Sequence, residues 1–498
     1  MVKAFIPKTG KKYLVKDYFF GGLDALCAPD ERAFSDVCGA DMSQLPEVSG
    51  EKSWEEFYAF PPTEYPLSFC SVGNRLLAFC RTLIQSGNYY YQTDSLNIVA
   101  LTPEAEAFVG EHIYYRESAD KFLISDYNFP RSMVQFCVYN DGGELSDAVG
   151  GKYDKKILIF PDKLSMDFDV DSDFSLTKLE NDEVKIPDLK YVTVHAARLF
   201  GVDDNRIYAS AYNDCCNWDL DVASDISADN AWASNTGADS RAGGDFSAIT
   251  AYGGKVVAFK KDFTHQVYNN KNPFRVYDVA RSGAICERSV CEVRGSLYYV
   301  SSEGVMKFTG AEPINVSREL GIERFEEGIC GGCADSLYVM EKGIIYVYNT
   351  ANSSWSKIEA PEKGKVVCFA EMNGILFALC NVSDSESYIY SLTGNPDSWY
   401  VESSARTMGV LSDKRISRVS LLCDIPEGGS VKVYLSGIDG EYSDKPVIDS
   451  KGKTGYAALR SLIRRTSSPL QKLKICCTGD VHLFGLQTYV YKEADGGE

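Results

Sequence analysis

The chain of 498 residues lacks any uninterrupted apolar run of about 18 residues, the length that a helix needs to cross a membrane. We therefore expect no membrane span. The N-terminus also lacks the apolar segment of a signal peptide, so we expect synthesis in a cytoplasm without export by that route. No G-x-S-x-G, H-E-x-x-H or P-loop signature occurs, and no common catalytic motif therefore points to an enzyme.

Proline and histidine are scarce, with 17 and 4 residues, and no amphipathic helix longer than about ten residues is evident. The chain is instead rich in tyrosine and glycine, with 31 and 41 residues, distributed over short apolar runs. Such a composition favours an all-β fold. The net charge of −19 makes nucleic acid an unfavourable direct partner and is most simply interpreted as a source of solubility.

The second half of the chain contains a repeat. Apolar segments that follow a turn recur about every 40 residues, beginning at Val256, Leu297, Leu337 and Ile375. This period is typical of a β-propeller blade, because one small antiparallel sheet must stack on its neighbours to bury both faces. The four residues should thus occupy equivalent strands. Earlier and less regular starts are Leu76, Phe122, Ile157 and Leu199. We expect roughly six to eight blades.

The pattern predicts three regions. Residues 1–60 are polar and poor in periodic apolar positions, which indicates an extended N-terminal arm that is ordered against a neighbouring subunit. Residues 61–396 form the predicted β-propeller, in which the Asp-, Ala-, Ser- and Gly-rich segment 213–245 is a long excursion between blades. Residues 400–492 contain at least four alternating segments and predict a C-terminal β-sandwich.

Three groups of residues carry a resemblance to known proteins. They are the Phe-Gly-Gly-Leu-Asp opening at 20–24, the segments 198–201 and 206–213 with Trp218, and the Gly-Ile-Asp-Gly turn at 437–440. Together they are similar to tailed-bacteriophage virion proteins that are built on a β-propeller, of the tail-hub, DNA-retention or tail-baseplate type. The resemblance implies a structural, non-enzymatic component of the tail, neck or baseplate, present in symmetric copies in the virion. Its partners would be other virion proteins and copies of itself.

Two other classes of function remain open. The first is an adhesin or hydrolase that recognises host-surface glycans with the loop face of the propeller, for which Trp218, Trp232 and Trp355 are candidates near loops. The second is a cellular scaffold propeller without a viral role. A basic cluster that could dock an acidic neighbour comprises Arg460, Arg464, Arg465, Lys472 and Lys474.

No metal, cofactor or catalytic residue is assigned. The four histidines lack a second His or Cys at zinc-binding spacing, so we interpret them as structural; they are His112, His195, His265 and His482. Cys330 and Cys333 form a lone C-x-x-C pair without a second pair, which we interpret as a coincidence. Most of the sixteen cysteines lie in apolar runs, which predicts reduced thiols in the core of a cytoplasmically made chain.

Aspartates alternate with other residues between positions 167 and 173. They are Asp167, Asp169, Asp171 and Asp173. In a strand, this spacing places four carboxylates on one face, which indicates a solvated sheet edge. A calcium loop that begins at Asp169 would place Glu180 at position 12, but Phe174 stands where such a loop requires glycine. The solvated edge is therefore the favoured interpretation, and bound calcium is the alternative.

Overall fold

The structure is a computed structural model that describes residues 12–17, 21–27, 33–86, 89–109, 114–115, 135–140, 155–161, 163–167, 177–181, 184–220, 228–234, 243–269, 271–383, 385–405, 414–436, 441–463 and 470–492. Helical structure in these residues is confined to two single turns, η1 (Glu287–Ser289) and η2 (Arg318–Leu320). The chain is therefore all-β, as predicted. None of the described helices is long and apolar enough to span a membrane.

Seven small antiparallel sheets follow one another along the described chain, and we number them ring sheets 1 to 7. Ring sheet 1 contains β6 (Glu64–Val72), β7 (Arg75–Ser86), β8 (Tyr89–Leu101), β9 (Ala107–Val109) and β10 (Tyr114–Tyr115). Ring sheet 2 contains β11 (Gln135–Asn140), β12 (Lys155–Phe160), β13 (Leu164–Asp167) and β14 (Thr177–Lys178). Ring sheet 3 contains β15 (Tyr191–His195), β16 (Arg198–Val202), β17 (Ile207–Ala209) and β18 (Trp232–Ala233).

The remaining ring sheets keep the four-stranded pattern. Ring sheet 4 contains β19 (Phe246–Tyr252), β20 (Lys255–Lys260), β21 (Phe263–Tyr268) and β22 (Arg275–Ala280). Ring sheet 5 contains β23 (Val290–Val293), β24 (Ser296–Ser301), β25 (Gly304–Phe308) and β26 (Ile314–Asn315). Ring sheet 6 contains β27 (Ile329–Cys333), β28 (Ser336–Glu341), β29 (Ile344–Asn349) and β30 (Ser354–Glu359). Ring sheet 7 contains β31 (Lys365–Met372), β32 (Ile375–Ser383), β33 (Glu386–Gly394) and the N-terminal strand β5 (Ser53–Ala59).

The sequence repeat marks the second strand of these sheets. The four repeat positions lie in consecutive second strands, as predicted: Val256 in β20, Leu297 in β24, Leu337 in β28 and Ile375 in β32. The earlier starts Leu76, Ile157 and Leu199 also lie in second strands, β7, β12 and β16, whereas Phe122 lies outside the described residues. A tight turn fixes each of these strands. Before Ile375, for example, Asn373 and Gly374 both have positive φ (55° and 75°), which suits a two-residue hairpin turn.

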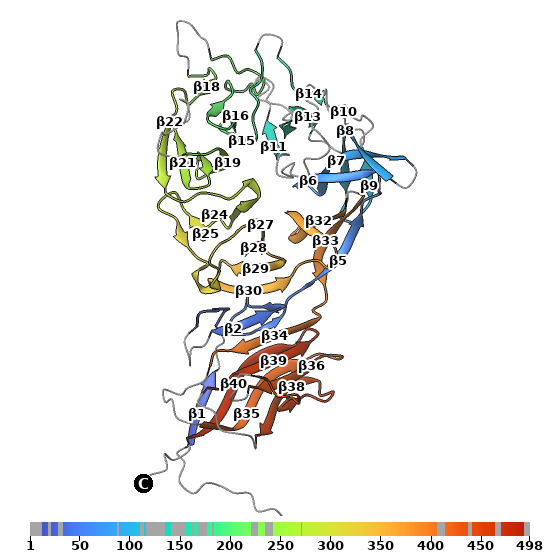
Figure 1. Ribbon diagram of the computed structural model, residues 1–498, viewed down its shortest axis with the longest axis vertical. Helices are drawn as coiled ribbons and strands as arrows, with labels where there is room; N and C mark the ends of the chain where they lie inside the picture. The colour runs from blue at the N-terminus through green and yellow to red at the C-terminus, as the bar shows by residue number, and fades with distance from the viewer. Residues whose placement is uncertain are drawn as a thin grey trace, which may run out of the picture.

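Hydrophobic clusters join the sheets into a closed, propeller-like ring (Figure 1). The clusters connect ring sheet 1 to 2, 2 to 3, 3 to 4, 4 to 5, 5 to 6, and 6 to 7 in turn. One further cluster joins the last ring sheet to the first by packing Phe69 and Leu76 with Phe377 and Leu379. The N-terminal strand β5 pairs with β33 and thereby completes the last sheet.

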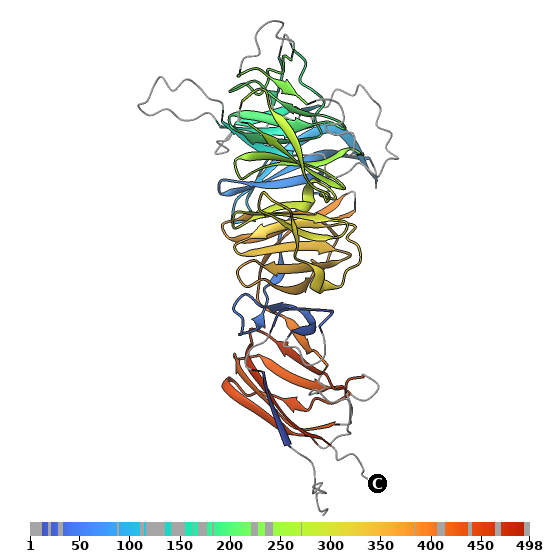
Figure 2. The same ribbon diagram turned by 90° about the vertical axis from the view of Figure 1, so that its left-hand side faces the viewer.

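Two further sheets lie together at one side of the ring, and we call them the lower sheets (Figures 1 and 2). One has the order β1 (Lys12–Asp17), β40 (His482–Lys492), β35 (Lys414–Ile425) and β38 (Gly455–Leu462). The other has the order β2 (Phe34–Cys38), β34 (Ser398–Ser403), β39 (Leu473–Thr478), β36 (Ser430–Leu435) and β37 (Ile448–Asp449). A two-stranded pair, β3 (Ala40–Asp41) and β4 (Ser49–Gly50), contacts β30 and β34.

Strands of the N-terminal region pair with later strands of the same chain, whereas the sequence predicts an extended arm. Strand β1 pairs with β40, β2 pairs with β34, and β5 belongs to ring sheet 7. These strands therefore pair with strands that lie hundreds of residues away in the same chain. The segment 213–245, expected as an excursion, contributes β18 as the fourth strand of ring sheet 3.

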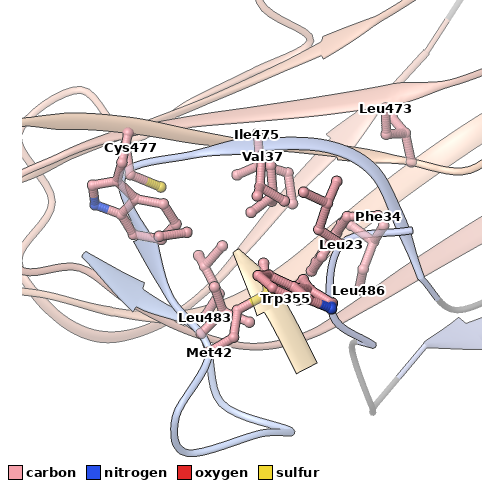
Figure 3. Packing of buried hydrophobic residues seen from close by; sticks show 14 of the residues in the cluster. Leu23, Phe34, Val37, Met42, Trp355, Leu473, Ile475, Cys477, Leu483 and Leu486 are labelled. Atoms are coloured by element: carbon pink, nitrogen blue, oxygen red, sulfur yellow. The ribbon is translucent and has the colours of Figure 1, made fainter. Parts of the chain in front are cut away.

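A single hydrophobic core joins the ring to the lower sheets. Trp355 on β30, the outer strand of ring sheet 6, is fully buried in it (Figure 3). Leu23, Phe34 and Met42 from the N-terminal region surround Trp355 together with lower-sheet residues such as Leu483 and Leu486. Backbone hydrogen bonds reinforce the joint, because the N–H of Gly39 donates to the carbonyl of Lys357 at 2.8 Å. The ring and the lower sheets therefore share one packed interior.

Candidate functional site

The described histidines lie in strands, and two of them contact carboxylates. His265 on β21 is fully buried, and its Nδ1 lies 2.6 Å from Asp278 Oδ1. His482 begins β40, and its Nδ1 contacts Glu47 Oε1. His195 ends β15, as its predicted strand requires, and His112 lies outside the described residues. Among the described residues, no group of three or more His, Cys, Asp or Glu could hold a metal ion.

The prediction that three tryptophans are available for sugar stacking is wrong, because two of the three side chains are buried. The Trp355 indole is fully buried and donates to the carbonyl of Val316 at 2.7 Å, and the Trp218 indole donates to that of Cys215 at 2.9 Å. Trp232 on β18 is half-buried and packs edge-on against Phe274. A position near a turn does not ensure exposure, because an indole whose N–H has a backbone acceptor can enter the core.

The structure does not bring together the two charged clusters of the sequence, the alternating aspartates and the basic cluster. Their members are either separated or lie outside the described residues. Of the alternating aspartates, Asp167 ends β13, whereas Asp169, Asp171 and Asp173 lie outside the described residues. Of the basic cluster, Arg460 is exposed on β38 in one lower sheet. Lys474 belongs to β39 in the other lower sheet, where its Nζ lies 3.7 Å from the centre of the Tyr400 ring. Lys472 pairs with Glu402 at 3.0 Å, and Arg464 and Arg465 lie outside the described residues. The described members therefore do not form one patch.

A surface hollow of about 330 Å³ lies between ring sheets 4, 5 and 6. The turn between β20 and β21 supplies Lys261 and Asp262, and the turn between β24 and β25 supplies Ser302. The connections between sheets supply Ile285 and the segment 324–326. Two cations, two carboxylates and one serine therefore surround an apolar floor of Ile285 and Phe325, a lining that suits a polar ligand or a peptide.

A buried carboxylate holds one wall of this hollow in place. Glu341 at the end of β28 accepts backbone hydrogen bonds at 3.0 to 3.2 Å from the N–H groups of Glu326, Glu327 and Gly328. The first of these residues lines the hollow. Backbone donors to an ionised carboxylate are stronger than neutral pairs, so the connection before β27 is rigid. The loop face at this point is thus preorganised.

A buried lysine lies next to the hollow in ring sheet 4. Lys260 ends β20, and its Nζ lies 4.9 Å from the centre of the Phe246 ring. Burial lowers the pKa of Lys260, whereas the carboxylates of Asp245 and Asp278 oppose this shift.

Arg288 in η1 joins ring sheets that are distant along the chain. Its Nη1 donates to the carbonyl of Val367 on β31 at 2.7 Å, and its Nη2 donates to the carbonyl of Leu67 on β6 at 3.0 Å. β31 and β6 are the first strands of ring sheets 7 and 1. One guanidinium that precedes ring sheet 5 therefore bridges the junction where the ring closes. The planar fork of arginine suits this double contact in a way that lysine does not.

Glu287 is a buried acid beside this bridge. Its Oε1 lies 3.4 Å from Arg288 Nε, and neither carboxylate oxygen accepts a hydrogen bond from the described residues. Burial raises the pKa of Glu287 to about 7, an effect that Arg288 opposes. Burial, together with the charge of Glu287, also raises the pKa of Tyr191 on β15. The charged form of Glu287 is therefore disfavoured in the interior of the ring.

Sequence reasoning selected neither Glu287 nor Arg288. The signal that was present is the Cys-Glu-Arg-Ser run at 286–289, which places adjacent opposite charges directly before an apolar strand. Charged residues are almost never fully buried unless they are paired. Adjacent opposite charges before an apolar strand therefore indicate a candidate for a buried pair.

Comparisons with known proteins add little to this geometry. No family model matches the chain, and no curated protein matches it. Among solved structures, the chain is similar to a catalytically inactive variant of virginiamycin B lyase from Staphylococcus aureus with quinupristin. The match has 9% sequence identity and a TM-score of 0.39, and it covers 68% of this chain and 99% of the other. At this level we draw no conclusion about activity.

Proposed function

We propose that the protein is a non-enzymatic structural component of a tailed-phage virion, present in symmetric copies in the tail, neck or baseplate. In this proposal, the seven ring sheets are the blades of a seven-bladed β-propeller, and the lower sheets form a β-sandwich. The observation that supports it most directly is the shared core around Trp355, which makes the ring and the lower sheets one stiff body. Stiffness of this kind suits a load-bearing wall rather than a hinged enzyme.

Particle composition tests this proposal. Virions purified from the source phage should contain a fixed number of copies of the chain, and this number should be a multiple of a small integer. Quantitative mass spectrometry against the major capsid protein measures it. A map of the particle should place the ring and the lower sheets in a symmetric layer. Absence of the chain from purified particles, or a variable trace amount, would refute the structural role.

The outer face of the lower sheet that contains β38 favours a second candidate, glycan recognition. Tyr456 on β38 is 68% exposed, and its ring lies 5.5 Å from that of Phe484 on β40. The Arg418 guanidinium lies 5.4 Å from the Tyr489 ring in the same sheet. The exposed ring of Tyr456 offers an apolar face to a sugar. Arg418, six residues along β35 from Asp424, the partner of Tyr456, offers hydrogen-bond donors on the same sheet.

A glycan array separates the two candidates. If this face binds host-surface sugars, the protein should bind a defined set of glycans, and Tyr456→Ala should abolish binding. Tyr277→Ala is the matched control, because Tyr277 is an exposed tyrosine on β22 of the ring. Equal binding by both variants, or no binding by the unmodified protein, would reject the glycan candidate and leave the structural role untouched.

A further inference from the structure

The two thiols of the C-x-x-C pair face opposite neighbours. Strand β27 keeps an unbroken register with β28 from Ile329 to Cys333, so residues three apart lie on opposite faces of the sheet. Cys333 Sγ lies 3.3 Å from the carbonyl of Gly374 in ring sheet 7. Cys330 instead belongs to the core that joins ring sheets 5 and 6. The two thiols of the motif therefore cannot pair with each other without rearrangement of the strand.

The partner of Cys330 comes from the next sheet. Cys291 on β23, the first strand of ring sheet 5, packs against the cluster that contains Cys330. Burial raises the pKa of the Cys330 thiol, and the neighbouring thiol of Cys291 raises it further. A second observation places the Cys291 sulfur against β27, because a Cβ added to Gly332 would lie 3.1 Å from Cys291 Sγ. The missing side chain at position 332 thus leaves room for this sulfur. Strands β23 and β27 contact each other directly.

We propose that Cys291 and Cys330 form an oxidant-dependent disulfide that links ring sheets 5 and 6. Neither thiol takes part in a disulfide in this structure. Cys291 is half-buried, whereas Cys330 is buried, so an oxidant reaches Cys291 first. The inference does not depend on the proposed role in a virion.

The reaction balances with a small-molecule disulfide, here glutathione disulfide, as the oxidant. The thiolate of Cys291 attacks one sulfur of glutathione disulfide, the S–S bond of the oxidant breaks, and one glutathione leaves. The sulfur of Cys330 then attacks that of Cys291, and the second glutathione departs with the proton of Cys330. Two protein thiols lose two electrons in total, and one glutathione disulfide becomes two glutathione thiols.

Cys286 is the competing thiol, because it also lies near Cys330. Burial raises the pKa of Cys286 to about 11, so this cysteine supplies little thiolate. The two outcomes are separable by trypsin. Cleavage after Arg281, Arg288 and Arg294 places Cys286 and Cys291 in different peptides.

The test is peptide mapping of the whole protein after incubation with glutathione disulfide and alkylation of the remaining thiols. The expected product is a peptide from 289–294 linked to one from 325–342, with fragmentation locating the bond at Cys330 rather than Cys333. Cys291→Ser should abolish the link. Cys333→Ser, on the same strand, should leave it intact. The oxidised protein should also unfold a few degrees higher than the reduced protein, and dithiothreitol should reverse this shift.

Three results would overturn the proposal. The first is that Cys291 and Cys330 both remain fully alkylated at oxidant concentrations that cross-link other pairs. The second is a dominant link through Cys286 or Cys333. The third is an unchanged link in the Cys291→Ser protein. Because Cys291 is half-buried and serine is isosteric, this variant should fold, and its far-ultraviolet circular dichroism checks that it does.

Discussion

The backbone N–H of Leu23 donates a 2.8 Å hydrogen bond to the carbonyl of Trp355, although Leu23 precedes the first strand of the ring and Trp355 lies in ring sheet 6. Through this bond, an N-terminal segment acts as an added partner for the outer strand of ring sheet 6. The indole of Trp355 then fills the space between that strand and the lower sheets. Trp355 thus belongs to ring sheet 6 by its backbone and to the core of the lower sheets by its side chain.

Trp355→Ala should destabilise the whole protein by about 3–5 kcal/mol, because it removes a large buried ring and leaves a cavity in the shared core. Denaturant unfolding followed by circular dichroism measures the change. Tyr277→Ala is the control, since this half-exposed ring packs only against Tyr268 among the described aromatic rings and its removal should cost about 1 kcal/mol. An unfolding midpoint equal to that of the unmodified protein would show that the joint does not stabilise the fold.

Arg288→Ala should loosen the closure of the ring, because the carbonyls of Val367 and Leu67 lose a charged donor. The expected cost is about 2 kcal/mol or more. Hydrogen exchange should accelerate in peptides that cover β6 and β31. Arg294→Ala removes a guanidinium whose ion pair with Asp335 is half-exposed, and it should leave exchange in those peptides unchanged. Equal exchange in both variants would contradict the bridging role.

Glu287 should make the protein more stable at pH 5 than at pH 8. Its pKa is raised to about 7 in the folded state, so the folded protein binds more protons than the unfolded chain between pH 4.5 and 7. Stability therefore falls as pH rises through this window, by up to about 3 kcal/mol from this group. Unfolding free energies of the unmodified protein and Glu287→Gln, measured across the window, isolate its contribution.

The Glu287→Gln protein should show a flatter pH profile than the unmodified protein. Glu292→Gln, at an exposed position on β23, should retain the original slope. If all three proteins have the same slope, the carboxyl of Glu287 titrates as it would in solvent.

Glu341→Gln should free the connection that borders the hollow. An amide presents N–H groups toward the backbone donors of Glu326, Glu327 and Gly328, so those bonds are lost or weakened. We expect a loss of about 1–3 kcal/mol and faster hydrogen exchange over the segment before β27. Glu303→Gln, in the exposed turn between β24 and β25, is the control. Unchanged exchange before β27 would show that other contacts fix this wall.

The regular half of the ring was predictable because its signals are local. A tight turn such as Asn373-Gly374, followed by an apolar run, determines a hairpin and its register within about ten residues of sequence. The second strands of ring sheets 4 to 7 therefore follow from spacing alone. β18 escaped prediction because it is two residues long and follows a polar, irregular segment.

The N-terminal strands could not be predicted in this way, because their partners are remote. Nothing near Ser53 or Phe34 indicates pairing with β33 or β34, which lie more than three hundred residues later in the chain. The same limit applies to Arg288, whose acceptors are backbone carbonyls and therefore leave no trace in residue identity. Trp355 was misjudged for a related reason, since its turn is covered by the N-terminal region.

The pairing of β1 with β40 has a mechanical consequence. Lys12 lies opposite Tyr491, so the outer ends of the first and last strands meet at the same corner of a lower sheet, away from the ring. A force that pulls these two ends apart would act across the ladder and open it one rung at a time. β1 and β40 would separate before the force reached the ring, so this corner would protect the ring from the load. A tether attached to β1 or β40 would likewise keep the ring away from the attachment point in a fixed orientation, and the ring itself would bear no force.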